Sequence, residues 1–200
     1  MKVTQKVKLN DEIGIEVLEG VYKPSDDSYL ILDLIEVTGQ EKVLEIGCGS
    51  GIISLHCGAE GCYVLAVDKD ERALENTRTN AKQNDIEIEI RRSDLFSKVD
   101  LERWDVIIFN PPYLPLEKGL PRDERWDGGE RGDEVIERFL KSSKKYLAEE
   151  GNIYLCFSSL SKGDLKKKIS TTGYEILDQK KKDFFFETIY AVKLKKPFDL

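Results

Sequence analysis

The chain has 200 residues, a net charge of −7 and 40% hydrophobic residues, enough apolar material for a domain with its own core. It contains no apolar run long enough to span a bilayer, and its first residues lack the apolar stretch of a secretion signal. We therefore expect the four cysteines to be reduced and the protein to be cytoplasmic. The acidic balance argues against nucleic acid as the main partner.

Strand patterns alternate with helical patterns along the chain, which predicts an α/β fold with a mainly parallel sheet and helices on both faces. Residues 1–23 read as short extended pieces. Helices are expected over residues 24–37, 51–60, 71–84, 133–149 and 164–171. Seven strands are expected, over residues 42–46, 63–67, 86–91, 105–109 and 153–158, with the last two forming a hairpin within 174–194. We expect one domain over residues 1–200, with an antiparallel strand at its carboxyl-terminal end.

A glycine-rich segment, Glu45-Ile46-Gly47-Cys48-Gly49-Ser50-Gly51, follows the first strand of the predicted sheet. Glycines at such a turn let the backbone approach a ligand closely, and Asp68 at the end of the next strand can accept bonds from ribose hydroxyls. Ile52 stands where a dinucleotide fingerprint would have its last glycine, and the loop has no Lys or Arg to balance phosphate. The acidic Glu45 favours a cationic ligand with a ribose, such as S-adenosylmethionine. The alternative is a purely structural turn.

Asp94 follows the strand predicted over residues 86–91, at the same edge of the sheet as the glycine loop. Its carboxylate, or the N–H of Leu95, could bond the edge of an adenine ring, against which Leu95 or Phe96 could pack. A simple turn cap is the competing interpretation of Asp94. The position beside other ligand-like residues favours the adenine site.

The tetrapeptide Asn110-Pro111-Pro112-Tyr113 follows an apolar run over residues 104–109. Ligands of open α/β sheets bind just beyond the carboxyl ends of the strands, so Asn110 is placed at such a site. The prolines fix the backbone and carry no N–H, which leaves the Asn110 amide and the carbonyls as polar groups beside the Tyr113 ring. This set suits a planar –NH₂ group. Alone, the tetrapeptide fits equally well a proline-ended strand whose Asn caps a turn.

Together these motifs resemble the class I S-adenosylmethionine-dependent methyltransferases that modify an exocyclic or amide nitrogen. The segments YKPSDDSYL, residues 22–30, and WDGGERGDEV, residues 126–135, resemble more narrowly the short HemK-type release-factor glutamine methyltransferases of archaea and eukaryotes. The resemblance covers nearly the whole chain. It implies a Rossmann-like seven-stranded fold, S-adenosyl-L-methionine as cofactor, and methylation at N5 of the glutamine in the GGQ motif of a class 1 release factor.

The resemblance also implies roles for individual residues. Residues 1–37 would cover the cofactor site, with the Ser28 hydroxyl in the place of the Thr that relatives often have. The implied cofactor contacts are Ser28, Glu45, Gly47, Gly49, Gly51, Asp68, Asp94, Leu95 and Asn110. Asn110 and the Pro111 carbonyl would accept the two amide protons of the glutamine, with Pro112 and Tyr113 beside it. The loop over residues 114–125 has no clear counterpart, and we assign it no role.

Other activities use parts of the same pattern. A nucleic-acid adenine or guanine methyltransferase shares the tetrapeptide, but the charge of −7 weighs against it. A lysine methyltransferase, an NAD(P)-dependent oxidoreductase and a non-catalytic cofactor-binding scaffold are weaker alternatives. The only histidine, His56, is predicted to be structural, and its spacing to Cys57 and Cys62 matches no zinc pattern, so we expect no metal site.

A protein partner is also implied. Eukaryotic relatives pair with a small zinc-binding activator, and the strand over residues 86–91 is a candidate docking edge. Its alternating Ile and Glu residues predict a half-exposed edge strand. The same glutamates fit ordinary protection of an edge against unwanted pairing.

Overall fold

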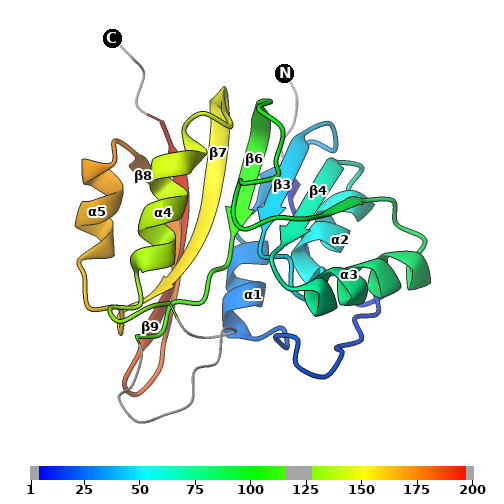
Figure 1. Cartoon of the computed structure of the whole chain (residues 1–200), viewed down its shortest axis with the longest axis horizontal. Coiled ribbons are helices and arrows are strands. Elements are labelled where there is room, and N and C mark those ends of the chain that lie inside the picture. The colour runs from blue at the N-terminus through cyan, green and yellow to red at the C-terminus, as the bar shows by residue number, and fades with distance from the viewer. Residues whose placement is uncertain (1–4, 116–127, 197–200) are drawn as a thin grey trace.

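A central sheet organises the computed structural model, which describes residues 5–115 and 128–196 (Figure 1). Within these residues the sheet has seven strands in the order β5-β4-β3-β6-β7-β9-β8. Their bounds are β3 Lys42–Ile46, β4 Tyr63–Asp68, β5 Glu89–Arg92, β6 Trp104–Phe109, β7 Leu147–Ser158, β8 Glu175–Asp183 and β9 Thr188–Lys195. All neighbouring pairs from β5 to β7 are parallel, whereas β9 is antiparallel to both β7 and β8. The predicted fold class is confirmed, with the antiparallel strand lying just inside the edge strand β8.

Five helices in the described part of the chain cover the two faces of this sheet. Their bounds are α1 Asp26–Leu32, α2 Ile52–Ala59, α3 Glu71–Gln83, α4 Glu134–Ser143 and α5 Leu165–Thr171. The central strands are mostly apolar and are buried along most of their length, as expected for parallel strands covered on both sides. Leu44 and Ile107 pack with α4 and α5, while their neighbours Val43 and Val106 pack with α1 and α2. The core is therefore double, with one layer on each face.

Two predicted helices are shorter than expected. The helix predicted over residues 24–37 ends at Leu32, because residues 36–37 form the short strand β2, Glu36–Val37, paired with β1, Gln5–Lys6. The helix predicted over residues 133–149 ends at Ser143, and β7 begins already at Leu147. Leu147 is fully buried and pairs with Trp104, so core packing overrides the helical pattern there.

The edge strands form where the sequence predicts them, but their first or last residues differ from the prediction. Strand β5 begins at Glu89 rather than at residue 86, and it is the edge strand that the alternation predicted. The hairpin of β8 and β9 is also confirmed, but its turn lies at residues 184–187, beyond the predicted lysine cluster.

A row of asparagines on α3 holds the segment that precedes α1. Asn76, Asn80 and Asn84 lie four residues apart and therefore on one face of the helix. Their side-chain oxygens accept the N–H groups of Leu18, Glu16 and Gly14, at 2.9, 3.1 and 2.8 Å respectively. Their amide groups donate to Glu16 O and Gly14 O in return. The helix thus pairs with an extended segment much as a neighbouring strand would.

Candidate functional site

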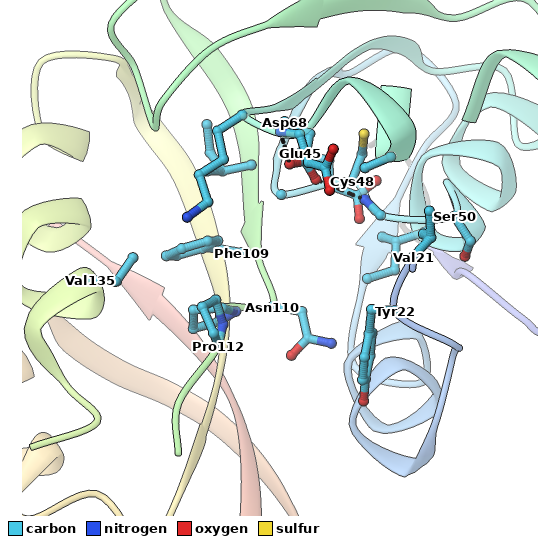
Figure 2. A pocket seen from close by; sticks show the side chains of 18 of the residues that line it. Val21, Tyr22, Glu45, Cys48, Ser50, Asp68, Phe109, Asn110, Pro112 and Val135 are labelled. Atoms are coloured by element: carbon cyan, nitrogen blue, oxygen red, sulfur yellow. Dashed lines mark hydrogen bonds between the residues drawn. The ribbon is translucent and has the colours of Figure 1, made fainter. Parts of the chain in front are cut away.

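A cavity of about 550 Å³ opens at the carboxyl ends of β3, β4 and β6 (Figure 2). This volume lies within the range of small-molecule sites in proteins. One wall is the loop after β3 together with the end of β4, and the opposite wall is the segment after β6. Residues 20–28 close the cavity from the amino-terminal side, through Gly20, Val21, Tyr22, Pro24, Asp27 and Ser28.

The glycine loop runs along the first wall with its glycines in the left-handed region. The φ angles of Gly47, Gly49 and Gly51 are 71°, 55° and 83°. A Cβ on Gly49 would meet nothing within 4 Å, so this glycine borders open space in the cavity. Gly51 does not line the cavity; it is the N-cap of α2, where a Cβ would come within 2.8 Å of Leu55 and 2.9 Å of Thr77. Its role is to seat the helix closely under the loop.

Glu45 is a buried carboxylate on the same wall. It accepts the N–H of Ser54 at 2.9 Å and also the Ser54 hydroxyl. Burial raises the pKa of Glu45 to about 8, even though both of these bonds lower it. A carboxylate that costs this much to ionise is favoured by a cation beside it, and a ligand ammonium in the cavity would supply one.

Asp68 lies beside Glu45 at the end of β4 (Figure 2). Its two oxygens accept the N–H groups of Gly49 and Asp70, at 3.1 and 2.9 Å, which fixes the carboxylate at the cavity surface. Burial raises the pKa of Asp68, the largest of several effects on this group. Each carboxylate oxygen can accept more than one hydrogen bond, so Asp68 retains capacity for the two hydroxyls of a ribose.

Asp94 and Leu95 line a further part of the cavity, beyond the end of β5. The Asp94 carboxylate accepts Arg138 of α4 at 3.0 Å, an exposed ion pair of small energetic weight. Leu95 has φ 49° and is nearly buried. Phe96 is instead in the core, stacked on Phe139 and Tyr146, so Leu95 is the apolar side chain available to a ring in the cavity.

Asn110 projects from the end of β6 into the cavity, across from Tyr22 (Figure 2). Its Oδ1 is buried and has no hydrogen-bond partner within the described structure. Buried polar atoms in proteins are nearly always hydrogen-bonded, so an open acceptor of this kind points to a donor supplied from outside the chain. Pro111 and Pro112 line the cavity next to it.

Asp27 of α1 links Tyr22 to Tyr113 at the part of the cavity near Asn110. This buried carboxylate accepts the hydroxyl of Tyr22, at 2.8 and 2.9 Å to its two oxygens, and that of Tyr113 at 3.1 Å. It also accepts the Ser28 hydroxyl at 3.1 Å. Burial and the Asp27 charge raise the pKa of both tyrosines, which therefore stay protonated and act as donors.

The structure brings the predicted site residues together, except Gly51, and adds others that the sequence did not single out. Tyr22, Asp27 and Arg138 line the cavity without having been assigned a role. Tyr22 and Asp27 lie inside the segment over residues 22–30, which the resemblance already singled out. Nothing in that segment predicts that Asp27 contacts Tyr113. The loop over residues 114–125 lies almost entirely outside the described residues.

Of the remaining titratable candidates, Cys48 lines the cavity, whereas His56 and the other three cysteines do not. The ring of His56 contacts the backbone oxygen of Ile52 and the N–H of Asn10, and it does not line the cavity. All four cysteines are buried, and burial raises the pKa of each thiol. Among the described residues no cluster of three or more His, Cys, Asp or Glu side chains is placed to hold a metal ion. Nor does any helix in that part of the chain have the length and apolarity needed to cross a membrane.

Residues 20–182 match the family described as the methyltransferase small domain. The chain belongs to this family. Among its relatives, a candidate protein N5-glutamine methyltransferase of Methanocaldococcus jannaschii is 35% identical over 97% of this chain and 91% of its own length. Human methyltransferase HEMK2 is 32% identical over 72% of this chain and 74% of its own. The release factor glutamine methyltransferase of Streptococcus pneumoniae is 31% identical over 70% of this chain and 55% of its own.

Solved methyltransferase structures share the fold. A ribosomal protein L11 methylase from Lactobacillus delbrueckii superposes with a TM-score of 0.59 at 20% identity, covering 78% of this chain and 70% of its own. A 16S rRNA guanine-N2 methyltransferase from T. thermophilus, solved with its methyl donor and guanosine, gives 0.57 at 16%, covering 78% of this chain and 38% of its own.

S-adenosyl-L-methionine is the cofactor of this methyltransferase, and the cavity fits it. Asp68 offers acceptors for ribose hydroxyls, the buried Glu45 offers a counter-charge for the methionine ammonium, and the open space over Gly49 admits the ligand close to the backbone. Leu95 and the neighbouring Asp94 are placed for the adenine ring.

Proposed function

We propose that this methyltransferase transfers a methyl group to N5 of the glutamine in the GGQ motif of a class 1 peptide chain release factor. The observation that carries the proposal is the buried, unpartnered Oδ1 of Asn110 in the cavity. An amide –NH₂ group of a substrate would satisfy it. The relatives that cover most of this chain, including one named for N5-glutamine methylation, favour a protein glutamine over a nucleobase.

An amide nitrogen is a weak nucleophile because its lone pair is delocalised into the carbonyl. S-adenosyl-L-methionine supplies a methyl group on a sulfonium, which is electrophilic without further activation. In our proposal Asn110 Oδ1 and the Pro111 carbonyl accept the two N–H groups of the glutamine. Acceptors held in this way stabilise the positive charge that develops on nitrogen as the N–CH₃ bond forms and the S–CH₃ bond breaks. The donor would leave as the neutral thioether S-adenosylhomocysteine, and the methylated nitrogen would lose one of its two protons to solvent. The two acceptors also fix the nitrogen in line with the methyl group, which contributes through orientation.

The aromatic side of the acceptor site comes from Tyr113 and Tyr22. Because Asp27 accepts both hydroxyls, each ring is held in one orientation at the cavity. We propose that the Tyr113 ring packs against the planar amide and that Tyr22 closes the site over the cofactor. Glu45 and Asp68 hold the donor, together with Ser28, Gly47, Gly49, Asp94 and Leu95.

The direct test offers the purified protein a donor with a tritiated methyl group, together with release factor, DNA or RNA. Label is expected in release factor and should vanish when the GGQ glutamine is replaced by Asn or Ala. Label found only in nucleic acid would overturn the proposal in favour of a nucleobase methyltransferase, and label in lysine side chains would replace it with a lysine methyltransferase. Peptide mapping of the labelled factor identifies the modified residue.

We also propose that the free side of β5 docks the small zinc-binding activator and that the enzyme works in the cytoplasm, where translation terminates. The support is geometric: β5 is an edge strand, and an unpaired edge can add a strand from another chain. Hydrogen exchange at residues 89–92 should slow when the activator binds. Full activity of the chain alone, with no change in exchange on adding the activator, would contradict this docking.

A further inference from the structure

The tip of the β8–β9 hairpin carries three consecutive phenylalanines in solvent. Phe184, Phe185 and Phe186 are 42, 91 and 83% exposed. A hydrogen bond from Phe184 N to Glu187 O, 2.7 Å long, closes the turn, and the rings of Phe185 and Phe186 meet edge to face at 4.5 Å. Exposed aromatic clusters of this kind mark interaction sites or aggregation hazards in proteins.

The tip lies at the carboxyl ends of the parallel strands, where the catalytic cavity also lies. Strand β8 is antiparallel to β9, which is antiparallel to β7, so β8 runs in the direction of β6 and β7. Its carboxyl end at Asp183 therefore faces the same way as Asn110. Figure 1 shows the hairpin extending past the ends of the parallel strands. Its two strands contact α1. A macromolecule that enters the cavity from this end of the strands can also contact the tip.

Two ion pairs link the hairpin to α1 and to Asp33, the residue that follows the helix. Lys182 Nζ lies 2.6 Å from Asp26, and Lys180 pairs with Asp33. Helix α1 also carries Asp27 and Ser28, which line the cavity. Because exposed ion pairs are weak, the packing of α1 against β8 and β9 is what mainly holds the hairpin at a defined position relative to the cavity.

The three lysines near the tip are all paired with carboxylates. Lys180, Lys181 and Lys182 each pair with an aspartate, the last two with Asp183 and Asp26. What the hairpin presents to a partner is thus an apolar aromatic pair rather than a cationic patch. This fits an apolar groove on a protein and not the phosphates of a nucleic acid or of an anionic lipid surface.

We propose that Phe185 and Phe186 are the docking anchor for the methyl-accepting protein, inserting into an apolar groove on the folded acceptor while its glutamine enters the cavity. The inference rests on the proposed function, since it assumes a protein acceptor. Aromatic side chains that become buried at an interface commonly dominate its binding energy. The anchor would let the enzyme select a folded protein, because the cavity itself contacts only the short segment that enters it.

The test compares full-length release factor with a short peptide that contains the GGQ motif. The double variant Phe185→Ser/Phe186→Ser should raise KM for the full-length factor by about tenfold or more, leaving kcat within about twofold. Kinetics on the peptide and the affinity for S-adenosyl-L-methionine should not change. The matched control is Leu101→Ser, which also removes an exposed apolar side chain. Leu101 is 74% exposed and lies just before β6, at the amino-terminal ends of the parallel strands. The KM of this control for both substrates should stay at the wild-type value.

An unchanged KM for the full-length factor, with wild-type turnover intact, would overturn the docking site and leave the proposed function standing. An equal loss on factor and peptide would also overturn it, because the effect would then lie in the catalytic site. Two further results would reassign the tip: binding of the wild-type enzyme to anionic vesicles that the double variant loses, or a wild-type dimer that the variant converts to a monomer. Absence of methylation by the wild-type enzyme would overturn the proposed function itself.

Discussion

At the scale of single residues, Glu45 combines a structural cost with a functional use. Its carboxylate is buried, and burial raises its pKa to about 8 from the ordinary 4.5. In the unfolded chain the same group ionises near pH 4.5, so the folded protein binds the extra proton between these values. The free energy of unfolding contributed by Glu45 therefore falls as pH rises from about 4.5 to 8. A bound ammonium would recover part of this loss.

Replacing Glu45 with Gln removes the titration and keeps the shape. Relative to wild type, the Glu45→Gln variant without cofactor should gain stability as pH rises from 5.5 to 8.5, by up to about 3 kcal/mol. Urea unfolding of both proteins at the two pH values measures this difference, in which the other titrating groups cancel. The variant should also bind S-adenosyl-L-methionine more weakly. A stability difference that is independent of pH would show that Glu45 is already ionised in the folded protein.

Asn110 carries the second prediction at this scale. Asn110→Ala removes the acceptor for the substrate amide, so methyl transfer should fall by a factor of about 100 or more, as for the loss of a transition-state hydrogen bond. Binding of the cofactor, measured by calorimetry, should change by no more than a few fold, because the other walls of the cavity remain. Turnover within tenfold of wild type would remove Asn110 from the chemistry.

At the scale of elements, the asparagine row of α3 determines how well the cavity is closed. Asn80 is fully buried and makes three bonds, to Glu16 N, Glu16 O and Ser50 O, and so joins the amino-terminal segment to the glycine loop. The segment after residue 18 then runs directly into the cavity wall at Gly20 and Val21. Removing hydrogen bonds of the asparagine row should therefore weaken cofactor binding as well as lower the stability of the fold.

Asn80→Ala should lower the free energy of unfolding by about 2–3 kcal/mol, because it leaves buried backbone groups unpaired. It should also weaken cofactor binding. Asn84→Ala is the matched control: it removes the same side chain at the more exposed end of the row, and its cost should be below about 1 kcal/mol. Equal losses in both variants would mean that the row acts only on the stability of α3.

The order and type of the sheet elements follow from the sequence, because apolar runs and helical periods report local preference directly. The ends of the elements do not follow from the sequence in this way. Leu147, for example, belongs to β7 because it packs in the core and pairs with Trp104, which is distant in sequence. The same limit applies to the site. Glu45, Asp68, Asp94 and Asn110 end or follow strands of one parallel sheet, so topology alone brings them together. Asp27 accepts the hydroxyl of Tyr113 from 86 residues further along the sequence, a contact that no local pattern encodes.

At the scale of the whole molecule, the cofactor should stabilise the fold by mass action. At a concentration of 100 times its Kd, S-adenosyl-L-methionine should add about 2.7 kcal/mol and raise Tm by roughly 5–10 °C for a chain of this size. NAD at the same concentration should leave Tm unchanged. Differential scanning calorimetry measures both, and an NAD-induced rise larger than that of S-adenosyl-L-methionine would contradict the assigned cofactor.

The buried cysteines make the molecule well suited to spectroscopy. None of the four thiols is exposed, and their raised pKa values keep them in the unreactive protonated form at neutral pH. A single surface substitution such as Leu101→Cys, at a side chain that is 74% exposed and lies away from the proposed docking site, would therefore react selectively with a maleimide dye in the folded protein. A second dye on the acceptor protein would turn the approach of the two molecules into an energy-transfer signal, without first replacing any native cysteine.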